Sequence, residues 1–346
     1  MSQLTLALHQ FLETCALKEF NTKTEFLKVS KIPDYTGRIN PSGRVIGVYQ
    51  NDKLLFIIKI YSSDTYDPKI ISQIANEGIF LRRLNLKESD ISLPFAVNQC
   101  IENSVTYDIM GFKAAKGESL IHFLEKGLID NAEQGIRNSA RALAEIHLKG
   151  REPSNSLSPT YHYHEEHALR YFKKMASQKP DIFPLDAKII EEKFFRLRSE
   201  IELLPSPTGW IHGDAIIRHF FYESATDRIT IIDLDRFVFS ILSDKVRGGP
   251  IGYDYAVFMS SLHQYAIYFG LETPVIHRLE TAFISVYKQQ VGIYFPSEPS
   301  IQYYTFVYIL KKACLTAQRL AENMDTPQVV LKQKKMFQYL IDFLNT

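Results

Sequence analysis

The sequence has few cysteines and no long hydrophobic run. These two features argue against a disulfide-rich, zinc-binding or membrane-spanning protein. Among its 346 residues only Cys15, Cys100 and Cys314 are cysteines, far apart and in no CxxC pair. That spacing predicts neither a disulfide framework nor a zinc site. No stretch reaches the roughly 20 apolar residues of a membrane-spanning helix, and the first residues lack the basic start of a secretory signal. We therefore expect a cytoplasmic protein without a transmembrane segment, although an effector exported without such a signal would show the same pattern.

The sequence also lacks an excess of charge of one sign. Lysine and arginine together number 40 against 39 acidic residues, which gives a formal net charge of +1. Proteins that hold nucleic acid by their overall charge are strongly basic, because phosphate contacts dominate that binding. The balance predicts no nucleic-acid partner, although a local basic patch would escape this argument.

The distribution of hydrophobic residues predicts a strand-rich first part and a mainly helical second part. β-rich runs lie at 28–32, 44–50, 53–61, 93–101 and 104–112, and helices are expected at 5–20 and about 68–84. From residue 117 onward the pattern is helical, apart from a β-rich passage at 210–236. We therefore predict an α+β fold, with one part covering residues 1–111 and the other covering 112–346.

The densest chemistry lies in the second part, around the tripeptide His212-Gly213-Asp214. Two β-rich runs follow it and form a predicted hairpin, which brings the residues before its first strand close to the end of its second. Asp214 and Asp233 are therefore expected to be neighbours, although they are distant in the sequence. Asp233 also ends an isoleucine-rich strand, where a buried carboxylate is costly without a cation. Such a pair indicates that one acid holds Mg²⁺ and the other handles a proton.

This passage resembles the catalytic loop of aminoglycoside phosphotransferases and choline kinases, which have H-G-D-x-x-x-x-N followed by a hydrophobic I-D-x-[DE]. The resemblance implies a two-lobed, protein-kinase-like fold, with a small antiparallel-sheet N-lobe that covers the nucleotide and a large, mainly helical C-lobe. It also implies ATP as the phosphoryl donor and Mg²⁺ as its metal ion. Carried onto this chain, Asp214 is expected to take the proton of the acceptor hydroxyl. Asp233 is expected to be the principal metal ligand, with Asp235 assisting a second ion.

One position departs from that pattern, because His219 stands where the family has asparagine. Imidazole binds Mg²⁺ poorly, since hard cations prefer oxygen. Either Asp233 carries the metal nearly alone, or His219 joins it on a softer ion such as Mn²⁺, or catalysis is impaired. The histidine and the sequence IDLDR also resemble lipopolysaccharide-core sugar kinases, which share the fold. The plain alternative is a chance tripeptide, with the acids paired to Arg218 or Arg236.

The strand-rich part offers a predicted ion pair. Lys59 lies in a β-rich run between apolar residues, and Glu77 falls within the apolar stripe of the helix at 68–84 when residues are spaced at 100°. A carboxylate that points at a core needs a cation, so Lys59 is its expected partner. In the family this pair places the lysine on the ATP phosphates. An edge position for Glu77, with Lys59 reaching solvent, is the alternative.

Two further segments are candidates for nucleotide contacts. Gly37, Ser42 and Gly43 lie in a turn between the first two β-rich runs, where backbone N–H groups could approach phosphates. The turn does not match G-x-G-x-x-G, so an ordinary surface hairpin explains it almost as well. Met110 and Phe112 end a predicted strand at the position where the family's hinge meets adenine through backbone groups.

Two polar residues are expected to have structural roles. His147 ends a helical run with an apolar stripe, which predicts a packed core histidine. Asp254, in the sequence GYDYAVFM, resembles the family's aspartate behind the catalytic loop. There the carboxylate accepts hydrogen bonds from the loop backbone around His212 and Gly213.

Together these features predict in-line transfer of the γ-phosphoryl group of ATP to a hydroxyl of a small molecule or sugar. The long helical segments at 160–205 and after 262 favour the small-molecule branch. Two alternatives stay open: a lipopolysaccharide-core sugar kinase, and a nucleotide-binding pseudokinase that acts as a scaffold or effector. The sequence indicates neither the identity of the acceptor nor an oligomeric state.

Overall fold

The computed structural model describes residues 2–31, 45–64, 89–92, 94–149, 160–178, 185–203, 207–233, 241–243, 246–247, 249–322 and 327–345. The chain divides into two compact units, each with its own buried core. One comprises Met1–Asn85 and Ile91–Lys116, and the other Leu86–Asp90 and Gly117–Thr346. The assignment of a nucleotide-covering role to residues 1–111 and of a catalytic role to 112–346 stays a prediction.

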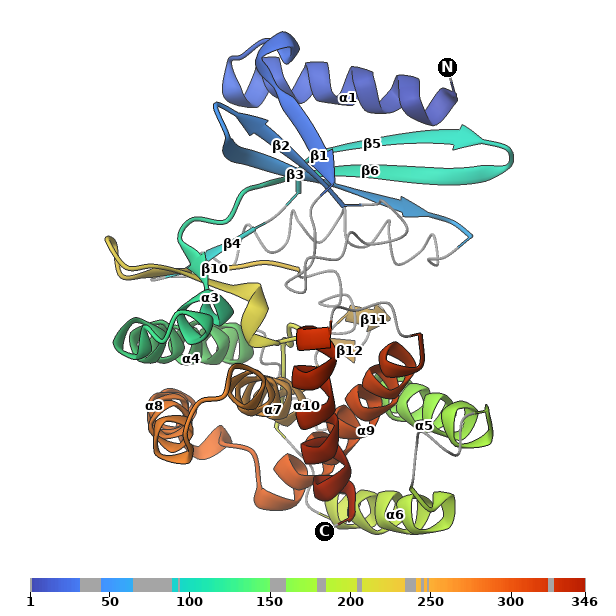
Figure 1. Cartoon of the computed structure of the whole chain (residues 1–346), viewed down its shortest axis with the longest axis vertical. Coiled ribbons are helices and arrows are strands. Elements are labelled where there is room, and N and C mark those ends of the chain that lie inside the picture. Colours follow the sequence, from blue (N-terminus) through green and yellow to red (C-terminus); the bar gives the residue numbers. More distant parts are fainter. Residues whose placement is uncertain are drawn as a thin grey trace. The chain divides into compact units, whose positions relative to one another are not determined.

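In its described residues, the first unit is a five-stranded antiparallel sheet with a helix packed along it (Figure 1). The strands are β1 (Lys28–Lys31), β2 (Val45–Gln50), β3 (Lys53–Ser62), β5 (Pro94–Glu102) and β6 (Val105–Lys113), and the helix is α1 (Gln3–Phe20). The strand order in the sheet is β1-β2-β3-β6-β5. All five strands and the helix α1 were predicted from the sequence, to within two residues at each end.

Local signals explain the ends of these elements. The Ser2 side chain accepts a hydrogen bond from the backbone N–H of Thr5, which caps α1, and Asn21 ends the helix in the left-handed conformation. Asn51 and Asp52 both have positive φ, 50° and 60°, in the tight turn between β2 and β3. Such turns match the twist of the strands they join, so the predicted hairpin is confirmed.

Alternation along β3 separates the two faces of the sheet. Phe56, Ile58 and Ile60 belong to the buried cluster that also includes Phe11 and Cys15 of α1. Because successive side chains of a strand point to opposite faces, the residues between them, Lys59 included, lie on the face away from α1.

The second unit is mainly helical. Its helices are α3 (Leu120–Glu125), α4 (Ile129–Lys149), α5 (Thr160–Gln178), α6 (Ala187–Leu203), α7 (Ile251–Phe269), α8 (Thr273–Val291), α9 (Glu298–Glu322) and α10 (Pro327–Asn345). Most residues of α7 are buried on every side of the helix, which makes it the centre of the unit. Within the residues that the structure describes, no helix combines the length and the apolar character needed to cross a bilayer.

Short strands interrupt these helices and carry the loop of interest. The strands β4 (Ser89–Ile91), β7 (Glu118–Ser119), β9 (Phe220–Glu223) and β10 (Arg228–Ile231) form a sheet in the order β4-β10-β9-β7. The shorter pairs are β8 (Thr208–Gly209) with β13 (Gly249–Pro250) and β11 (Ile241–Ser243) with β12 (Val246–Arg247). The antiparallel pair β9–β10 is the predicted hairpin. A sheet-rich first unit and a helical second unit confirm the predicted α+β class.

Gly209 of β8 lies very close to the backbone of α4, just before the loop that contains Asp214. A Cβ atom on Gly209 would lie 2.3 Å from the carbonyl oxygen of His147, at the end of α4. No L side chain fits at that distance, so only glycine lets β8 run against the helix. The residues that follow β8 are therefore held directly beside α4.

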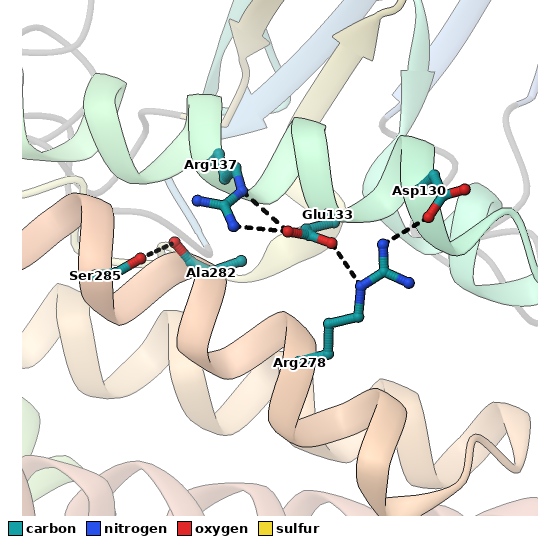
Figure 2. Close-up of polar contacts among 6 residues, drawn as sticks. All are labelled: Asp130, Glu133, Arg137, Arg278, Ala282 and Ser285. Carbon is teal, nitrogen blue, oxygen red and sulfur yellow. Dashed lines mark hydrogen bonds and ion pairs between the residues drawn. The ribbon is translucent and has the colours of Figure 1, made fainter.

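The helices α4 and α8 are joined by a network of ion pairs (Figure 2). Glu133 of α4 accepts from Nη2 of Arg137, one turn along the same helix, at 2.7 Å, and from Nε of Arg278 on α8 at 2.6 Å. Nη2 of Arg278 also reaches Oδ1 of Asp130 at 2.6 Å. Glu133 is the most enclosed of these groups, with 17% of its side chain exposed.

Replacing Glu133 with glutamine should destabilise the protein at neutral pH by about 1 kcal/mol. The hydrogen bond from Arg137, aided by Arg278, holds the pKa of Glu133 below its usual 4.5, although partial burial opposes the shift. A depressed pKa contributes stability above the pKa of the unfolded chain, and the contribution is lost as pH falls. The difference in unfolding free energy between wild type and variant should therefore shrink below about pH 4.5.

Denaturant unfolding at pH 7 and pH 4 measures this difference. Glu192→Gln is a suitable control, because Glu192 is exposed and lies 3.9 Å from Lys188 in a similar helical pair. A loss for Glu133→Gln that is the same at both pH values would show that the ionised carboxylate is not responsible.

Candidate active site

The loop after β8 is held from behind by a buried carboxylate. Asp254 lies in the first turn of α7 and is fully buried. Its Oδ1 accepts the backbone N–H of Gly213 at 2.9 Å, and its Oδ2 accepts the backbone N–H of His212. Gly213 has φ of +77°, a conformation that side chains rarely tolerate. The role expected for Asp254 is thereby confirmed.

The same carboxylate ties the loop to two more helices. His147, at the end of α4, has its Nε2 3.2 Å from Oδ2 of Asp254 and its Nδ1 2.6 Å from the hydroxyl of Tyr287 on α8. His147 is 1% exposed, so it is the packed core histidine predicted from the sequence. Its two hydrogen bonds also give it a definite task, which is to orient Asp254.

His212 links the loop to the end of the following hairpin. Its Nε2 donates to the carbonyl oxygen of Ile232 at 2.9 Å, and its Nδ1 faces the N–H of Asp214 at 3.3 Å. Burial lowers the pKa of His212 and so favours the neutral ring. A neutral ring has one donor and one acceptor nitrogen, which agrees with Nε2 donating and Nδ1 accepting. A neutral histidine thus positions the backbone of Asp214 relative to β10.

His219 brings the two predicted acids together. Its Nδ1 donates to the backbone carbonyl of Asp214 at 2.9 Å, and its Nε2 lies 3.1 Å from Oδ2 of Asp233. The backbone carbonyl of His219 also accepts the N–H of Ile232 at 2.9 Å. The prediction that Asp214 and Asp233 are neighbours is therefore confirmed, and one imidazole separates them.

Asp233 has an unusual backbone. Its φ is +67°, in the left-handed region, which costs a residue other than glycine about 1 kcal/mol. Residues held in such conformations cluster at functional sites. About a third of the Asp233 side chain is exposed, and Asp214 is half-buried, so both carboxylates are accessible from outside the core.

The pair His219 and Asp233 fits two adjacent positions around a divalent ion. Neighbouring ligands of an octahedral ion with bonds of about 2.1 Å are about 3 Å apart, close to the 3.1 Å between Nε2 and Oδ2. Within the described ranges no cluster of three or more His, Cys, Asp or Glu side chains is placed to hold a metal. Further ligands would then come from water and phosphate, which usually complete the coordination of Mg²⁺ in proteins.

Of these two residues, Asp233 is the better ligand. Nε2 of His219 already accepts a hydrogen bond from Nε of Arg218 at 3.1 Å, which would have to break before the nitrogen could bind a metal. Arg218 was considered in the sequence only as a partner for the acids, and its contact with His219 was not anticipated. Asp235, the third predicted metal ligand, lies outside the described residues.

Two residues of α9 were not among the site residues predicted from the sequence. Tyr308 is 3% exposed, and the ammonium nitrogen of Lys312 lies 5.2 Å from the centre of its ring. Burial lowers the pKa of Lys312 to about 7, and the negative charge of Asp214 opposes that shift. A tyrosine and a lysine four residues apart share one face of a helix, which was the available signal. Nothing in the sequence placed that face near Asp214.

The candidates in the first unit are only partly covered by the described residues. Lys59 pairs with Met110 across β3 and β6, and its ammonium nitrogen lies 5.1 Å from the centre of the Phe112 ring. These three residues share the face of the sheet that turns away from α1. Four others lie outside the described residues: Gly37, Ser42, Gly43 and Glu77. The ion pair between Lys59 and Glu77 therefore stays a prediction.

Comparison with solved structures defines the class of fold. An amicoumacin kinase matches with a TM-score of 0.60 at 12% identity, covering 96% of this chain and 93% of its own. A choline kinase from Cryptosporidium parvum matches with a TM-score of 0.58 at 14% identity, covering 97% and 95%. An aminoglycoside phosphotransferase from Streptomyces rimosus matches with a TM-score of 0.53 at 13% identity, covering 90% and 99%. The predicted kinase-like fold is confirmed.

The sequence itself identifies the family. The model of the phosphotransferase enzyme family matches residues 55–264, more than half of the chain, and no curated protein matches significantly. The chain belongs to the phosphotransferase enzyme family and is a kinase. The matched region contains the loop with Asp214, the hairpin that ends at Asp233, and Asp254.

Proposed function

We propose that this kinase transfers the γ-phosphoryl group of ATP to a hydroxyl group of a small molecule. The observation that carries the proposal is the position of Asp214 and Asp233 on either side of His219, on a loop that Asp254 holds from behind. Choline kinases and aminoglycoside phosphotransferases, which resemble this chain in fold, are named for small-molecule acceptors.

In this proposal Asp214 is the general base. Its backbone is fixed on both sides, since its N–H faces His212 and its carbonyl accepts from His219. A half-buried carboxylate on so rigid a support needs little rearrangement to meet the acceptor hydroxyl and take its proton. Most of the catalysis then comes from positioning and from stabilisation of charge, as is usual in phosphoryl transfer.

Asp233 is the proposed principal holder of a divalent ion, with Asp235 and His219 as additional candidates. When bound, such an ion supplies positive charge to the phosphate oxygens of ATP. Magnesium is the ion we expect from the oxygen ligand, and Mn²⁺ would tolerate the imidazole better. We further propose that the enzyme works in the cytoplasm, where ATP is supplied.

The predicted contacts of the first unit are also proposed to bind the nucleotide. Lys59, supported by Glu77, would bind the α- and β-phosphates, and the turn at Gly37, Ser42 and Gly43 would cover them. Met110 and Phe112 would meet adenine through their backbone groups. The shared sheet face of Lys59, Met110 and Phe112 supports the grouping of these three.

A second candidate function is a nucleotide-binding pseudokinase. One observation favours it: Nε2 of His219, which stands in the family's metal-ligand position, is already occupied by Arg218. In that case ATP would bind, but transfer would be absent or very slow. A lipopolysaccharide-core sugar kinase remains a variant of the first proposal that differs only in its acceptor.

Release of ADP in the presence of Mg²⁺ tests the proposal. Purified protein would be incubated with ATP and a panel of hydroxylated acceptors, which includes choline, aminoglycosides, sugars, sugar phosphates and hydroxy acids. The expected result is ADP release that one class of acceptor stimulates. Binding of ATP without stimulation by any class would favour the pseudokinase instead.

Replacing Asp233 with alanine should weaken the metal-dependent binding of ATP by roughly 10- to 100-fold, or about 1.4 to 2.8 kcal/mol. The reason is the loss of a carboxylate that faces His219 at ligand distance. Calorimetric titration of ATP with and without Mg²⁺ measures the effect, and Asp342→Asn on the exposed side of α10 is a suitable control. Unchanged affinity in the Asp233 variant would remove this residue from the metal site.

A further inference from the structure

The charged residues inside α9 are all positive. Between Glu298 and Glu322, which begin and end the helix, the charged residues are Lys311, Lys312 and Arg319. The positive charges of Lys311, Arg319 and the loop residue Arg218 all act on Lys312, and Asp214 is the negative charge that acts on it. Lys312 therefore lies within electrostatic range of the loop that carries Asp214.

Lys312 is a partly buried cation that stands against an aromatic ring. Its side chain is half-buried, and its ammonium nitrogen lies above the ring of the buried Tyr308. In the part of the chain that the structure describes, no carboxylate forms an ion pair with it. The face of an aromatic ring offsets only about 0.5–2 kcal/mol of the cost of enclosing a cation. An ammonium in this state is expected to receive a negative partner from elsewhere.

The charge of Asp214 reaches both residues of this pair. It acts on Tyr308 as well as on Lys312. If Asp214 takes a proton from the acceptor hydroxyl, then the acceptor must be bound beside it. An ammonium group within electrostatic range of Asp214 is therefore a candidate to contact another part of the same acceptor.

We propose that Lys312 determines acceptor specificity, and that the acceptor carries an anionic group, a carboxylate or a phosphate, in addition to its hydroxyl. This inference rests on the proposed function of Asp214 and goes beyond it by naming the charge of the acceptor. Tyr308 is the positioning residue that holds the ammonium group in place.

The proposed acceptor differs in charge from the acceptors for which the structurally similar kinases are named. Choline carries a quaternary ammonium group and aminoglycosides carry several amines, so each would bring a positive charge to Lys312 and Arg218. Like charges brought together in a binding site cost several kcal/mol, which selects against such molecules. A neutral acceptor would leave the ammonium of Lys312 unpaired, whereas an anionic acceptor would pair with it.

The inference also predicts how acceptor binding depends on pH. Lys312 has a pKa of about 7 because burial disfavours its charged form, so it begins to lose its proton near neutrality. An anionic acceptor binds the protonated form. Its KM should therefore rise as pH increases above about 7, unless the acceptor itself changes charge in that range.

The experiment compares acceptors in pairs that differ only in charge. Hydroxy acids would be measured against their uncharged amides, and sugar phosphates against the parent sugars, with choline as the cationic case. The variants are Lys312→Met, which keeps an unbranched side chain one atom shorter and removes the charge, and Lys312→Arg, which keeps the charge. Lys288→Met is the matched control, since Lys288 also stands over a ring, that of Phe295 at 5.4 Å, but on α8.

The expected result is a higher kcat/KM for the anionic member of at least one pair. Lys312→Met should raise the KM of that acceptor by about 10-fold or more and remove its rise with pH. Lys312→Arg should restore most of the affinity, and Lys288→Met should have no effect. The KM for ATP and the slow hydrolysis of ATP without acceptor should also be unchanged in Lys288→Met.

Three results would overturn the inference. Equal or better turnover of neutral and cationic acceptors by the wild type would overturn the inference alone, because the proposed kinase activity would still stand. A fall in kcat for every acceptor and for ATP hydrolysis in Lys312→Met would show that the lysine acts on the transferred phosphoryl group instead. Absence of stimulated ADP release with every acceptor would overturn the proposed function, and the inference with it.

Discussion

Replacing Asp214 with asparagine should lower the kcat of phosphoryl transfer by about 10²- to 10⁴-fold, the usual contribution of a general base. Binding of ATP should change little, because the residue proposed to hold the metal is Asp233. Asparagine has nearly the same shape as aspartate, and the backbone bonds of residue 214 to His212 and His219 do not involve its side chain. The loss should therefore be one of proton transfer rather than of folding.

Steady-state ADP release with a saturating acceptor gives kcat, and calorimetric titration gives the affinity for ATP in the same preparation. Asp342→Asn, on the exposed side of α10, is the control for a change of one charge. A variant at Asp214 with wild-type turnover would show that the acceptor proton leaves by another route. A variant that no longer binds ATP would place Asp214 among the nucleotide ligands.

Replacing Asp254 with alanine should destabilise the protein by about 3 kcal/mol or more. The carboxylate accepts the backbone N–H groups of His212 and Gly213 and faces Nε2 of His147, all in a fully buried position. Its removal leaves these donors without an acceptor in the core. The loop with Asp214 would also lose its support, so kcat should fall at temperatures where the variant is still folded.

Ser261→Ala on the same helix provides a matched comparison for Asp254. The Ser261 hydroxyl accepts one buried backbone N–H, that of Ile217, at 3.0 Å, and donates to the carbonyl oxygen of Phe258 at 2.9 Å. A neutral group that accepts one backbone N–H should cost about 1–2 kcal/mol, clearly less than Asp254. Denaturant unfolding measures both losses. If Asp254→Ala were no more destabilising than Ser261→Ala, the charge of Asp254 would not be what holds the loop.

The parts of this account that were predictable depend on short-range patterns. Alternation of apolar residues gave the strands of the first unit, and the hairpin after the tripeptide at 212–214 brought Asp214 near Asp233. The role of Asp254 followed from its resemblance to a family position. Each of these predictions needed only a local period or a motif whose spacing is set by the backbone.

The parts that were not predictable depend on contacts between distant segments. Nε2 of His219 contacts both Arg218 and Asp233. The contact with Asp233 depends on the path of the chain after β10, which no sequence pattern predicts. The sequence does not predict the left-handed backbone of Asp233 either. Lys312 was overlooked because its importance lies in what α9 packs beside, which only the tertiary structure shows.

Titration of ATP into the wild-type protein in the presence of Mg²⁺ tests the central claim most directly. The account predicts saturable binding that chelation of the metal abolishes and that Asp233→Ala weakens by roughly 10-fold or more. The absence of measurable affinity for ATP with Mg²⁺ or Mn²⁺ would contradict it, as would binding that neither chelation nor the Asp233 variant changes.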